Sequence, residues 1–329
     1  MPNAAIRDPD PAAIAEAATR LAGGELVAFP TETVYGLGAN AEDAAAVRRL
    51  YAAKGRPAAH PVIVHVADAA SIGRWARDVP DGARRLAEAF WPGPLTLILP
   101  RASGVDDVVT GGQDSVGLRV PSHPVARALL AAFRDRGGHG IAAPSANRFG
   151  HVSATTAQHV ADDFGDAVAM ILDGGAAPVG IESTIVAFRD GVPMLLRPGG
   201  IASAAIEAAL GERLHARDDH APRASGTLAS HYAPRTRARL VAAHALAAEI
   251  AQHAERDEAV AVLARTAPCP AEFDGRWIAA PADAEGYART LYAALRELDA
   301  AHADAILIEA VPDAPPWQAV RDRLARATR

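Results

Sequence analysis

Short apolar runs alternate with alanine-rich stretches over about the first 210 residues of the chain. Apolar runs bounded by proline and glycine are typical of buried strands. They predict strands over 25–30, 61–66, 94–100, 115–121, 140–144, 169–173 and 183–188. Apolar positions at helical spacing predict helices over 11–22, 42–53, 80–90, 123–134, 155–163 and 202–210. This alternation favours an α/β domain with a largely buried, mixed sheet.

The pattern breaks between residues 212 and 238, where the chain is polar, mixed in charge and contains proline, glycine and serine. Such a composition is typical of a linker. Apolar runs then return as "ARLVAA", "AVAVLA", "RWIAAP" and "AILIEAV", with a long helix expected over about 283–303 and a final helix after it. We therefore predict a large α/β domain over 1–211, a linker over 212–238 and a small α/β domain over 239–329.

Composition narrows the functional class. The net charge of −6 argues against a general nucleic-acid binder, which usually has a basic surface. The single cysteine, Cys269, allows no internal disulfide and no cysteine-based zinc cage. The first residues contain no apolar segment typical of a secretion signal, and no apolar run reaches the ~20 residues of a membrane-spanning helix. We therefore expect a soluble, cytoplasmic protein without membrane partners.

The first candidate site is the segment "FPTETVYGLGAN" at 29–40, where a strand ends in polar residues. Ligands of α/β proteins bind at the carboxyl ends of strands, so Thr31 is a candidate binding residue. The alternative is a simple turn in which the threonines hydrogen-bond the backbone. The segment "YGLG" lacks the third glycine of a dinucleotide-binding fingerprint.

The second candidate site is "KGRP", which contains Lys54 and Arg56 on either side of a glycine. Lys54 is the only lysine among 33 basic residues. A compact ammonium suits a position between phosphate or carboxylate oxygens, where the planar guanidinium of arginine fits less well. The alternative is that one lysine persists by chance on the surface. Nearby His65 ends a strand, and a lone histidine there is more often a packed core residue than a ligand.

Other strand ends also carry small polar or cationic side chains. Their combination predicts a cationic cleft suited to phosphates and a small carboxylate. These residues are Arg119 in "GLRVPSHP", Ser145, Asn147 and Ser153 in "APSANRFGHVS", Ser183 in "ESTIV" and Arg197 in "LRPGG".

Several catalytic motifs are absent. The sequence contains no GxxxxGK[ST] phosphate loop, no GxSxG nucleophile turn and no HExxH zinc motif. No pair of carboxylates stands out as an acid and base. An enzyme with this sequence would therefore work mainly by positioning its substrates and stabilising charge.

Taken in order, these motifs resemble those of the L-threonylcarbamoyladenylate synthase family in its long, two-domain form. The resemblance rests on "PTETVYGLG", "KGRP" with "HPVIVH", "WPGPLTLIL", "GLRVPSHP", "APSAN", "ESTIV", "LRPGG" and "SHYAP", over about residues 10–240. It implies a twisted, open mixed sheet with a concave cationic cavity, the YrdC-like fold, followed by a small Rossmann-like domain. His60 stands where relatives often have asparagine.

The resemblance implies condensation of L-threonine, bicarbonate and ATP, usually with Mg²⁺, to threonylcarbamoyl-AMP and pyrophosphate. A separate transferase then forms t6A beside the tRNA anticodon. The implied catalytic residues are Lys54 and Arg56, and no metal-ligating residue is expected. The implied ATP site is Lys54, Arg56, Ser115, Ser145, Asn147, Ser153, Arg197 and Tyr232; the threonine site is Thr31, His65, Arg119, Ser183 and the backbone of Ala143. Tyr232, with His231, would fold over the cleft as a lid.

Three other functions stay open at this stage. Related domains of hydrogenase maturation factors use carbamoyl phosphate, but they adjoin acylphosphatase and zinc-finger segments that this sequence lacks. A cationic cavity would also suit weak binding of tRNA or another RNA without catalysis. The third alternative is a regulatory nucleotide-binding protein. The role of residues 239–329 is open between lid support, a partner dock and regulation.

Overall fold

The computed structural model describes residues 6–228 and 231–328, which form two compact units. The first unit contains residues 6–149, 153–178 and 182–227. The second contains 228 and 231–328 together with two short segments, Gly150–Val152 and Val179–Ile181. The segment predicted as a linker is thus divided between the units after Thr227.

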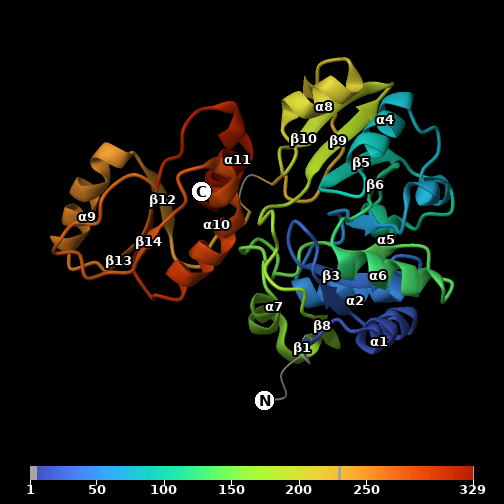
Figure 1. Ribbon diagram of the computed structural model, residues 1–329, viewed down its shortest axis with the longest axis horizontal. Helices are drawn as coiled ribbons and strands as arrows, with labels where there is room; N and C mark the ends of the chain where they lie inside the picture. Colours follow the sequence, from blue (N-terminus) through green and yellow to red (C-terminus); the bar gives the residue numbers. More distant parts are fainter. Residues whose placement is uncertain (1–5, 229–230, 329) are drawn as a thin grey trace. The chain divides into compact units, whose positions relative to one another are not determined.

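The first unit is built on an eleven-stranded mixed sheet with the order β1-β8-β2-β3-β7-β4-β6-β5-β9-β10-β11 (Figure 1). The strands are β1 (Ile6–Arg7), β2 (Val27–Phe29), β3 (Gly36–Asn40), β4 (Ile63–His65), β5 (Leu95–Pro100), β6 (Ser115–Arg119), β7 (Ile141–Ala142), β8 (Met170–Leu172), β9 (Thr184–Arg189), β10 (Val192–Arg197) and β11 (His215–Ala216). Its α-helices are α1 (Pro11–Ala22), α2 (Ala44–Lys54), α3 (Ile72–Trp75), α4 (Asp81–Phe90), α5 (Asp107–Thr110), α6 (Pro124–Arg134), α7 (Ala157–Phe164) and α8 (Ser203–Leu210).

Alternate residues of the interior strand β2 belong to different core clusters, so both faces of the sheet are buried there. Val27 and Phe29 pack with α1 and α6, which lie side by side (Figure 1). Ala28 belongs to the other cluster, which includes residues of α2 and α4. A strand buried on both faces is continuously apolar, as the sequence of β2 is.

One difference from the sequence prediction is β3, since no strand was predicted between residues 30 and 61. It pairs antiparallel with β2, with Gly38 opposite Val27. A Cβ atom on Gly38 would lie 2.9 Å from the ring of Phe29. The glycine is therefore required by close packing inside the sheet, and it does not mark a turn.

The second unit has a smaller sheet of four parallel strands in the order β12-β15-β13-β14. Its strands are β12 (Ala238–Val241), β13 (Val260–Ala264), β14 (Trp277–Ala279) and β15 (Ala305–Glu309); its α-helices are α9 (Leu246–Ala254), α10 (Ala284–Asp299) and α11 (Gln318–Ala327). The prediction of a mixed α/β sheet followed by a smaller α/β domain is confirmed.

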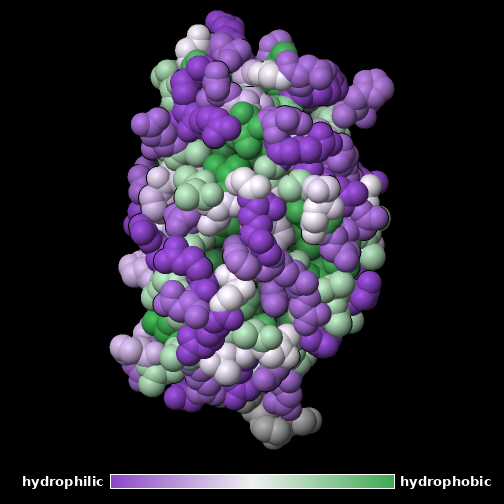
Figure 2. All heavy atoms as spheres, turned by 90° about the vertical axis from the view of Figure 1, so that its right-hand side faces the viewer, coloured by the Kyte–Doolittle hydropathy of each residue, from purple (hydrophilic) through white to green (hydrophobic). Residues whose placement is uncertain are grey.

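Figure 2 shows one face of the molecule, coloured by hydropathy. On the face in Figure 2, hydrophobic residues appear in small areas among hydrophilic ones. Among the described residues, the exposed large hydrophobic side chains are Ile6, Val192 and Leu240. No helix in this part of the chain has the length and apolar character needed to cross a membrane.

Candidate active site

The loop after β2 buries three consecutive polar residues, Thr31, Glu32 and Thr33. Oγ1 of Thr31 accepts hydrogen bonds from the N–H groups of Thr33 and Val34, at 3.2 and 3.3 Å. The same hydroxyl donates to the carbonyl of Val34 at 2.6 Å. Thr31 thus stabilises a tight turn, which was one of the two interpretations left open by the sequence.

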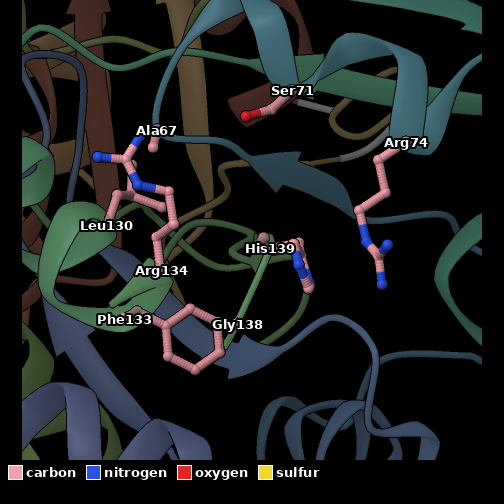
Figure 3. Close-up of a pocket in the computed structure, with 9 residues that line it drawn as sticks. Ala67, Ser71, Arg74, Leu130, Phe133, Arg134, Gly138 and His139 are labelled. Carbon is pink, nitrogen blue, oxygen red and sulfur yellow. The ribbon is translucent and has the colours of Figure 1, made fainter. Parts of the chain in front are cut away.

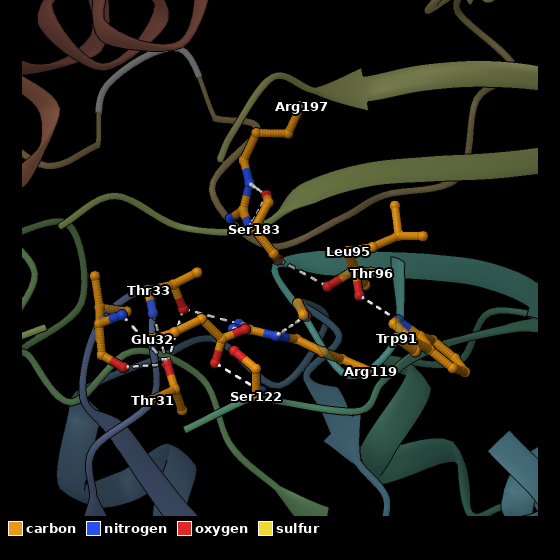
Figure 4. A network of polar contacts seen from close by, with 12 residues as sticks. Thr31, Glu32, Thr33, Trp91, Leu95, Thr96, Arg119, Ser122, Ser183 and Arg197 are labelled. Atoms are coloured by element: carbon orange, nitrogen blue, oxygen red, sulfur yellow. Dashed lines mark hydrogen bonds and ion pairs between the residues drawn. The ribbon is translucent and has the colours of Figure 1, made fainter. Parts of the chain in front are cut away.

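Arg119, the last residue of β6, forms a buried ion pair with Glu32 (Figure 4). Its Nη2 donates to Oε1 of Glu32 at 2.6 Å, and its Nη1 donates to the hydroxyl of Thr33 at 2.9 Å. The second carboxylate oxygen of Glu32 accepts the N–H of Ser122 at 3.0 Å. Burial acts to raise the pKa of Glu32, but the charge of Arg119 and these hydrogen bonds outweigh it, so the net pKa is lowered. The pair therefore stays ionised in a dry position.

Arg197 and Ser183 form a second buried cluster, at the facing ends of β10 and β9 (Figure 4). Nη2 of Arg197 donates to the backbone carbonyl of Ser183 at 2.9 Å and to its hydroxyl at 3.1 Å. The Ser183 hydroxyl also lies 2.8 Å from that of Thr96 on β5. Nη1 of Arg197 donates to the carbonyl of Ser225 at 2.9 Å. One guanidinium therefore orders two loops.

Lys54 is the last residue of α2, and only 2% of its surface is exposed. Its Nζ donates to the carbonyl oxygens of Ser145 at 2.6 Å and Asn147 at 2.5 Å. Its own carbonyl accepts the N–H of Phe149 at 2.9 Å. Gly55, with a φ of 64°, ends the helix in the left-handed region. Burial, assisted by the charge of Arg56, holds the pKa of Lys54 well below its usual range.

Arg56 is also buried and joins the same region to the loop before β12. Its Nη2 donates to the carbonyl of Pro61 at 2.7 Å and to the hydroxyl of Ser225 at 3.1 Å. Its guanidinium lies over the ring of Phe149, with 5.6 Å between Cζ and the ring centroid. Lys54 and Arg56 are thus both connected to the segment around residues 145–149.

The segment after β7 carries three of the predicted residues. Asn147 and Ser153 are buried, and Ser145 is partly buried. The Ser153 hydroxyl donates to Oε1 of Glu182 at 2.6 Å. The backbone N–H of Ala143 donates to the carbonyl of Ile63 at 2.9 Å, which ties this segment to β4.

His65, at the end of β4, is buried against Phe29, with the two rings edge to face and 6.2 Å between centroids. Its Nδ1 has no hydrogen-bond partner among the described residues. Burial, with a smaller contribution from Arg119, lowers the pKa of His65 from 6.5 to about 3. The imidazole is therefore neutral at physiological pH.

The depressed pKa of His65 predicts a pH-dependent stability. Between pH 6.5 and about 3 the unfolded chain binds a proton at this position that the folded protein does not. The free energy of unfolding should therefore fall as the pH falls, by about 1.4 kcal/mol per unit. Urea denaturation at pH 7.5 and 5 should show a smaller pH effect for His65→Phe than for wild type. His244→Gln, on the surface, should behave as wild type; equal slopes for all three proteins would contradict the prediction.

Ser115 begins β6 and lines a small hollow of the first unit. Pro61, Gln113, Arg223 and Ser225 also line this hollow. The N–H of Arg223 donates to the side-chain oxygen of Gln113 at 2.7 Å. Ser225 links this hollow to Arg56 and Arg197, so Ser115 lies in the same part of the unit as the cationic residues.

A separate cavity of about 150 Å³ contains none of the predicted residues (Figure 3). Leu130, Phe133, Arg74, Arg134 and His139 are among the residues that line it. Both arginines are already paired with carboxylates, Arg74 with Glu42 and Arg134 with Asp68. An apolar cavity with neutralised charges does not suit a triphosphate.

Tyr232 and His231 belong to the second unit, and Ser230 of "SHYAP" lies outside the described residues. The ring of Tyr232 stacks on Tyr292 of α10 with 5.6 Å between centroids, and the guanidinium of Arg323 lies over it at 5.2 Å. Tyr232 has a φ of 62°, which is rare for a residue other than glycine. Its backbone is therefore held by its surroundings, while its proposed action as a lid stays a prediction.

Sequence reasoning gave no role to three residues that bind predicted ones directly. Glu32 binds Arg119, Glu182 binds Ser153 and Thr96 binds Ser183. Glu32 and Glu182 occur inside the motifs "PTET" and "ESTIV", each beside a residue that we did assign. Glu32 and Arg119 are 87 residues apart in the sequence, so the only sequence signal for Glu32 was its place next to Thr31 in "PTET".

Two family models match the chain. One, described as telomere recombination (Sua5, YciO and YrdC), matches residues 19–199. The other, described as the C-terminal domain of threonylcarbamoyl-AMP synthase, matches residues 201–328. The chain belongs to the threonylcarbamoyl-AMP synthase family. The resemblance inferred from the motifs is thereby confirmed.

Members of this family match almost the whole chain. The threonylcarbamoyl-AMP synthase of Pyrococcus abyssi is 40% identical over 93% of this chain and 91% of its own length. The Bacillus subtilis synthase is 39% identical over 95% of this chain and 92% of its own length. The crystal structure of P. abyssi Sua5 complexed with L-threonine superposes with a TM-score of 0.89, covering 96% of this chain and 94% of that one. A His/Tyr double-alanine variant of P. abyssi Sua5 gives 0.88, with coverages of 96% and 92%.

Proposed function

We propose that this protein is a threonylcarbamoyl-AMP synthase, which condenses L-threonine, bicarbonate and ATP and releases pyrophosphate. The observation that carries this proposal is the match to curated synthases along nearly the full chain, which includes both family domains. A related structure, 39% identical, contains L-threonine. The buried cations at the strand ends of the first unit suit such anionic substrates.

The reaction needs charge neutralisation more than a protein nucleophile. The amine of threonine takes up CO₂ from bicarbonate, with loss of water, to form a carbamate. A carbamate oxygen then bonds to the α-phosphorus of ATP, and the bond from that phosphorus to the pyrophosphate oxygen breaks. Two anions must approach each other in this step, so preorganised cations lower the barrier. Buried arginines provide that environment. The pKa of Lys54 is lowered by burial, and the negative charge of entering phosphates would favour its protonated form, so that it acts as a further cation.

We assign ATP binding to Lys54, Arg56, Ser115, Ser145, Asn147, Ser153, Arg197 and Tyr232, with Lys54 and Arg56 as the catalytic cations. An ammonium has three donors, and the carbonyls of Ser145 and Asn147 use two of them. The third donor is assigned to a phosphate oxygen. The two carbonyl partners of Lys54 fix the direction of the third N–H, which supports the assignment of Lys54 as a positioned point charge.

We assign threonine binding to Thr31, His65, Arg119, Ser183 and the backbone of Ala143. Arg119 uses donors on all three of its nitrogens for Gly93, Thr33 and Glu32, and two Nη hydrogens remain for a substrate carboxylate. His65, neutral by virtue of its lowered pKa, supplies an uncharged hydrogen-bonding group. A neutral imidazole avoids attracting a second anion to the same pocket.

Mg²⁺, the downstream partners and the location belong to the same proposal. Within the described part of the chain, no three His, Cys, Asp or Glu side chains group to hold a metal ion. Since Mg²⁺ is commonly bound through substrate phosphates, we assign it to the ATP that enters the site. We propose that a separate transferase uses the product to form t6A in tRNA, and that both steps take place in the cytoplasm. Weak binding of tRNA by this protein is part of the same proposal.

Pyrophosphate release from ATP tests the proposed function. The purified protein should release pyrophosphate only when threonine and bicarbonate are both present, because the attacking carbamate contains atoms of both. Serine should substitute poorly for threonine, although one methyl group accounts for only about 1–3 kcal/mol of discrimination. Release in the absence of either substrate would show a different ATP-using reaction, and no release would refute the proposal.

A further inference from the structure

The two short segments that belong to the second unit adjoin polar residues of the candidate active site. Gly150–Val152 ends immediately before Ser153, and Val179–Ile181 ends immediately before Glu182. Ser153 and Glu182 belong to the first unit, where they share a buried hydrogen bond of 2.6 Å. The peptide chain therefore connects both members of this pair directly to segments that the second unit holds.

Helix α10 holds the first segment through Arg296. Nη2 of Arg296 donates to the backbone carbonyl of Val152 at 2.6 Å. The N–H of Ala233 donates to the carbonyl of Gly150 at 3.0 Å, which adds a contact from the "SHYAP" segment. Both bonds lie inside the second unit and fix the backbone of the three residues that precede Ser153.

The second segment contacts the backbone of the same helix through Gly180. A Cβ atom on Gly180 would lie 2.4 Å from Cα and 2.5 Å from the carbonyl oxygen of Arg289. The φ of Gly180 is +79°, which also favours glycine. No side chain fits between this segment and α10, so the contact leaves little freedom to the residues before Glu182.

The contact points on α10 form a single stripe. Arg289, Tyr292 and Arg296 are separated by three and four residues, which places them along one face of a helix. They contact, in order, Gly180, the ring of Tyr232 and the carbonyl of Val152. One rigid helix therefore holds both segments and the "SHYAP" tyrosine.

We propose that α10 is a positioning element of the nucleotide site, which acts by fixing the segments before Ser153 and Glu182. This inference rests on the proposed function, because it takes Ser153 as part of the ATP site. It assigns to the second unit the task of keeping the Ser153–Glu182 pair in its binding geometry. Arg296 and Gly180 are positioning residues in this account, since it assigns no substrate contact to either.

The chain offers a matched control for Gly180. Gly191, in the turn between β9 and β10, has a φ of +81°, and a Cβ atom there would meet nothing within 4 Å. Alanine at either position costs the same backbone strain, and only at Gly180 does it also push against α10. A difference between Gly180→Ala and Gly191→Ala therefore reports the contact with the helix.

The test measures the dissociation constant of ATP by calorimetry, which does not depend on turnover, and KM for ATP and threonine by pyrophosphate release. Gly180→Ala should weaken ATP binding about tenfold, and Gly191→Ala less than twofold. For comparison, a 1 Å displacement at a catalytic site can lower the reaction rate about 100-fold. Threonine binding without ATP should stay within about twofold in both variants. A purely structural role would lower the melting temperature and leave the ATP affinity unchanged.

A second pair of variants keeps the test valid if Gly180→Ala does not fold. Arg296→Ala should weaken ATP binding, Arg296→Lys should recover part of it by keeping a donor, and Arg239→Ala, on a surface ion pair, should have no effect. Equal ATP affinities for wild type, Arg296→Ala and any folded Gly180→Ala would overturn this inference alone. A wild-type protein that binds no ATP would overturn the proposed function and this inference with it.

Discussion

Replacing Lys54 by arginine should lower kcat/KM for threonine-dependent pyrophosphate release by at least about 100-fold, or ~2.7 kcal/mol. The ammonium fits between two carbonyl oxygens, 2.6 and 2.5 Å away, in a position that is 2% exposed. A guanidinium is larger and planar, so it would displace the segment around residue 145 and turn its donors away from the phosphate. This fit explains why a chain rich in arginine has its only lysine here.

Two further variants separate charge from shape at this position. Lys54→Met keeps most of the side-chain volume without the charge, and it should be as inactive as Lys54→Ala. Arg48→Lys, on the exposed face of the same helix, should retain wild-type activity. Turnover of Lys54→Arg within threefold of wild type would contradict the account, because it would show that any cation suffices.

Removing the carboxylate of Glu32 should reduce the free energy of unfolding by about 3–5 kcal/mol, because it leaves the buried Arg119 without its counter-charge. Urea denaturation at neutral pH measures this loss. The matched control is Glu25→Ala, which breaks an exposed ion pair with Arg20 of similar length, 3.0 Å. Surface pairs contribute about 0–1 kcal/mol, so the control should be nearly neutral.

A double variant and the pH dependence test the same ion pair. Glu32→Gln combined with Arg119→Met should be more stable than Glu32→Gln alone, since no unpaired charge stays buried. The lowered pKa of Glu32 means that its contribution is complete above pH 4.5, the ordinary value, and is lost as the pH falls through the lower folded-state pKa. Equal losses for Glu32→Ala and Glu25→Ala would contradict the assignment.

The sequence predicted helices and strands well where buried positions give a clear spacing of apolar residues. Strands such as β5 and helices such as α1 and α6 were predicted within one or two residues, since apolar spacing and capping residues mark them. β3 was not predicted as a strand, because glycines are unfavourable in strands, and at Gly38 the glycine is required by packing against Phe29. Glycine is needed there because a side chain of the neighbouring strand β2 comes close, and a single sequence does not reveal which residues of different strands come close to each other.

The contacts within the candidate site could be predicted from the sequence only in part. The sequence grouped Lys54 with Ser145 and Asn147, and the structure joins them. The partners are backbone carbonyls, however, and the serine hydroxyl and asparagine amide on which the prediction rested are not the groups that Lys54 binds. Backbone groups are present at every residue, so their use at a site leaves no trace in the sequence.

The most direct test of the central claim is to follow labelled bicarbonate into product. Purified protein with ATP, threonine and ¹⁴C-bicarbonate should form a labelled compound that has the mass of threonylcarbamoyl-AMP, in equal amount to the pyrophosphate released. Omission of threonine or ATP should abolish the label. Pyrophosphate release without incorporation of the label into an adenylate would contradict the account, because the carbamate would then not be the group that attacks ATP.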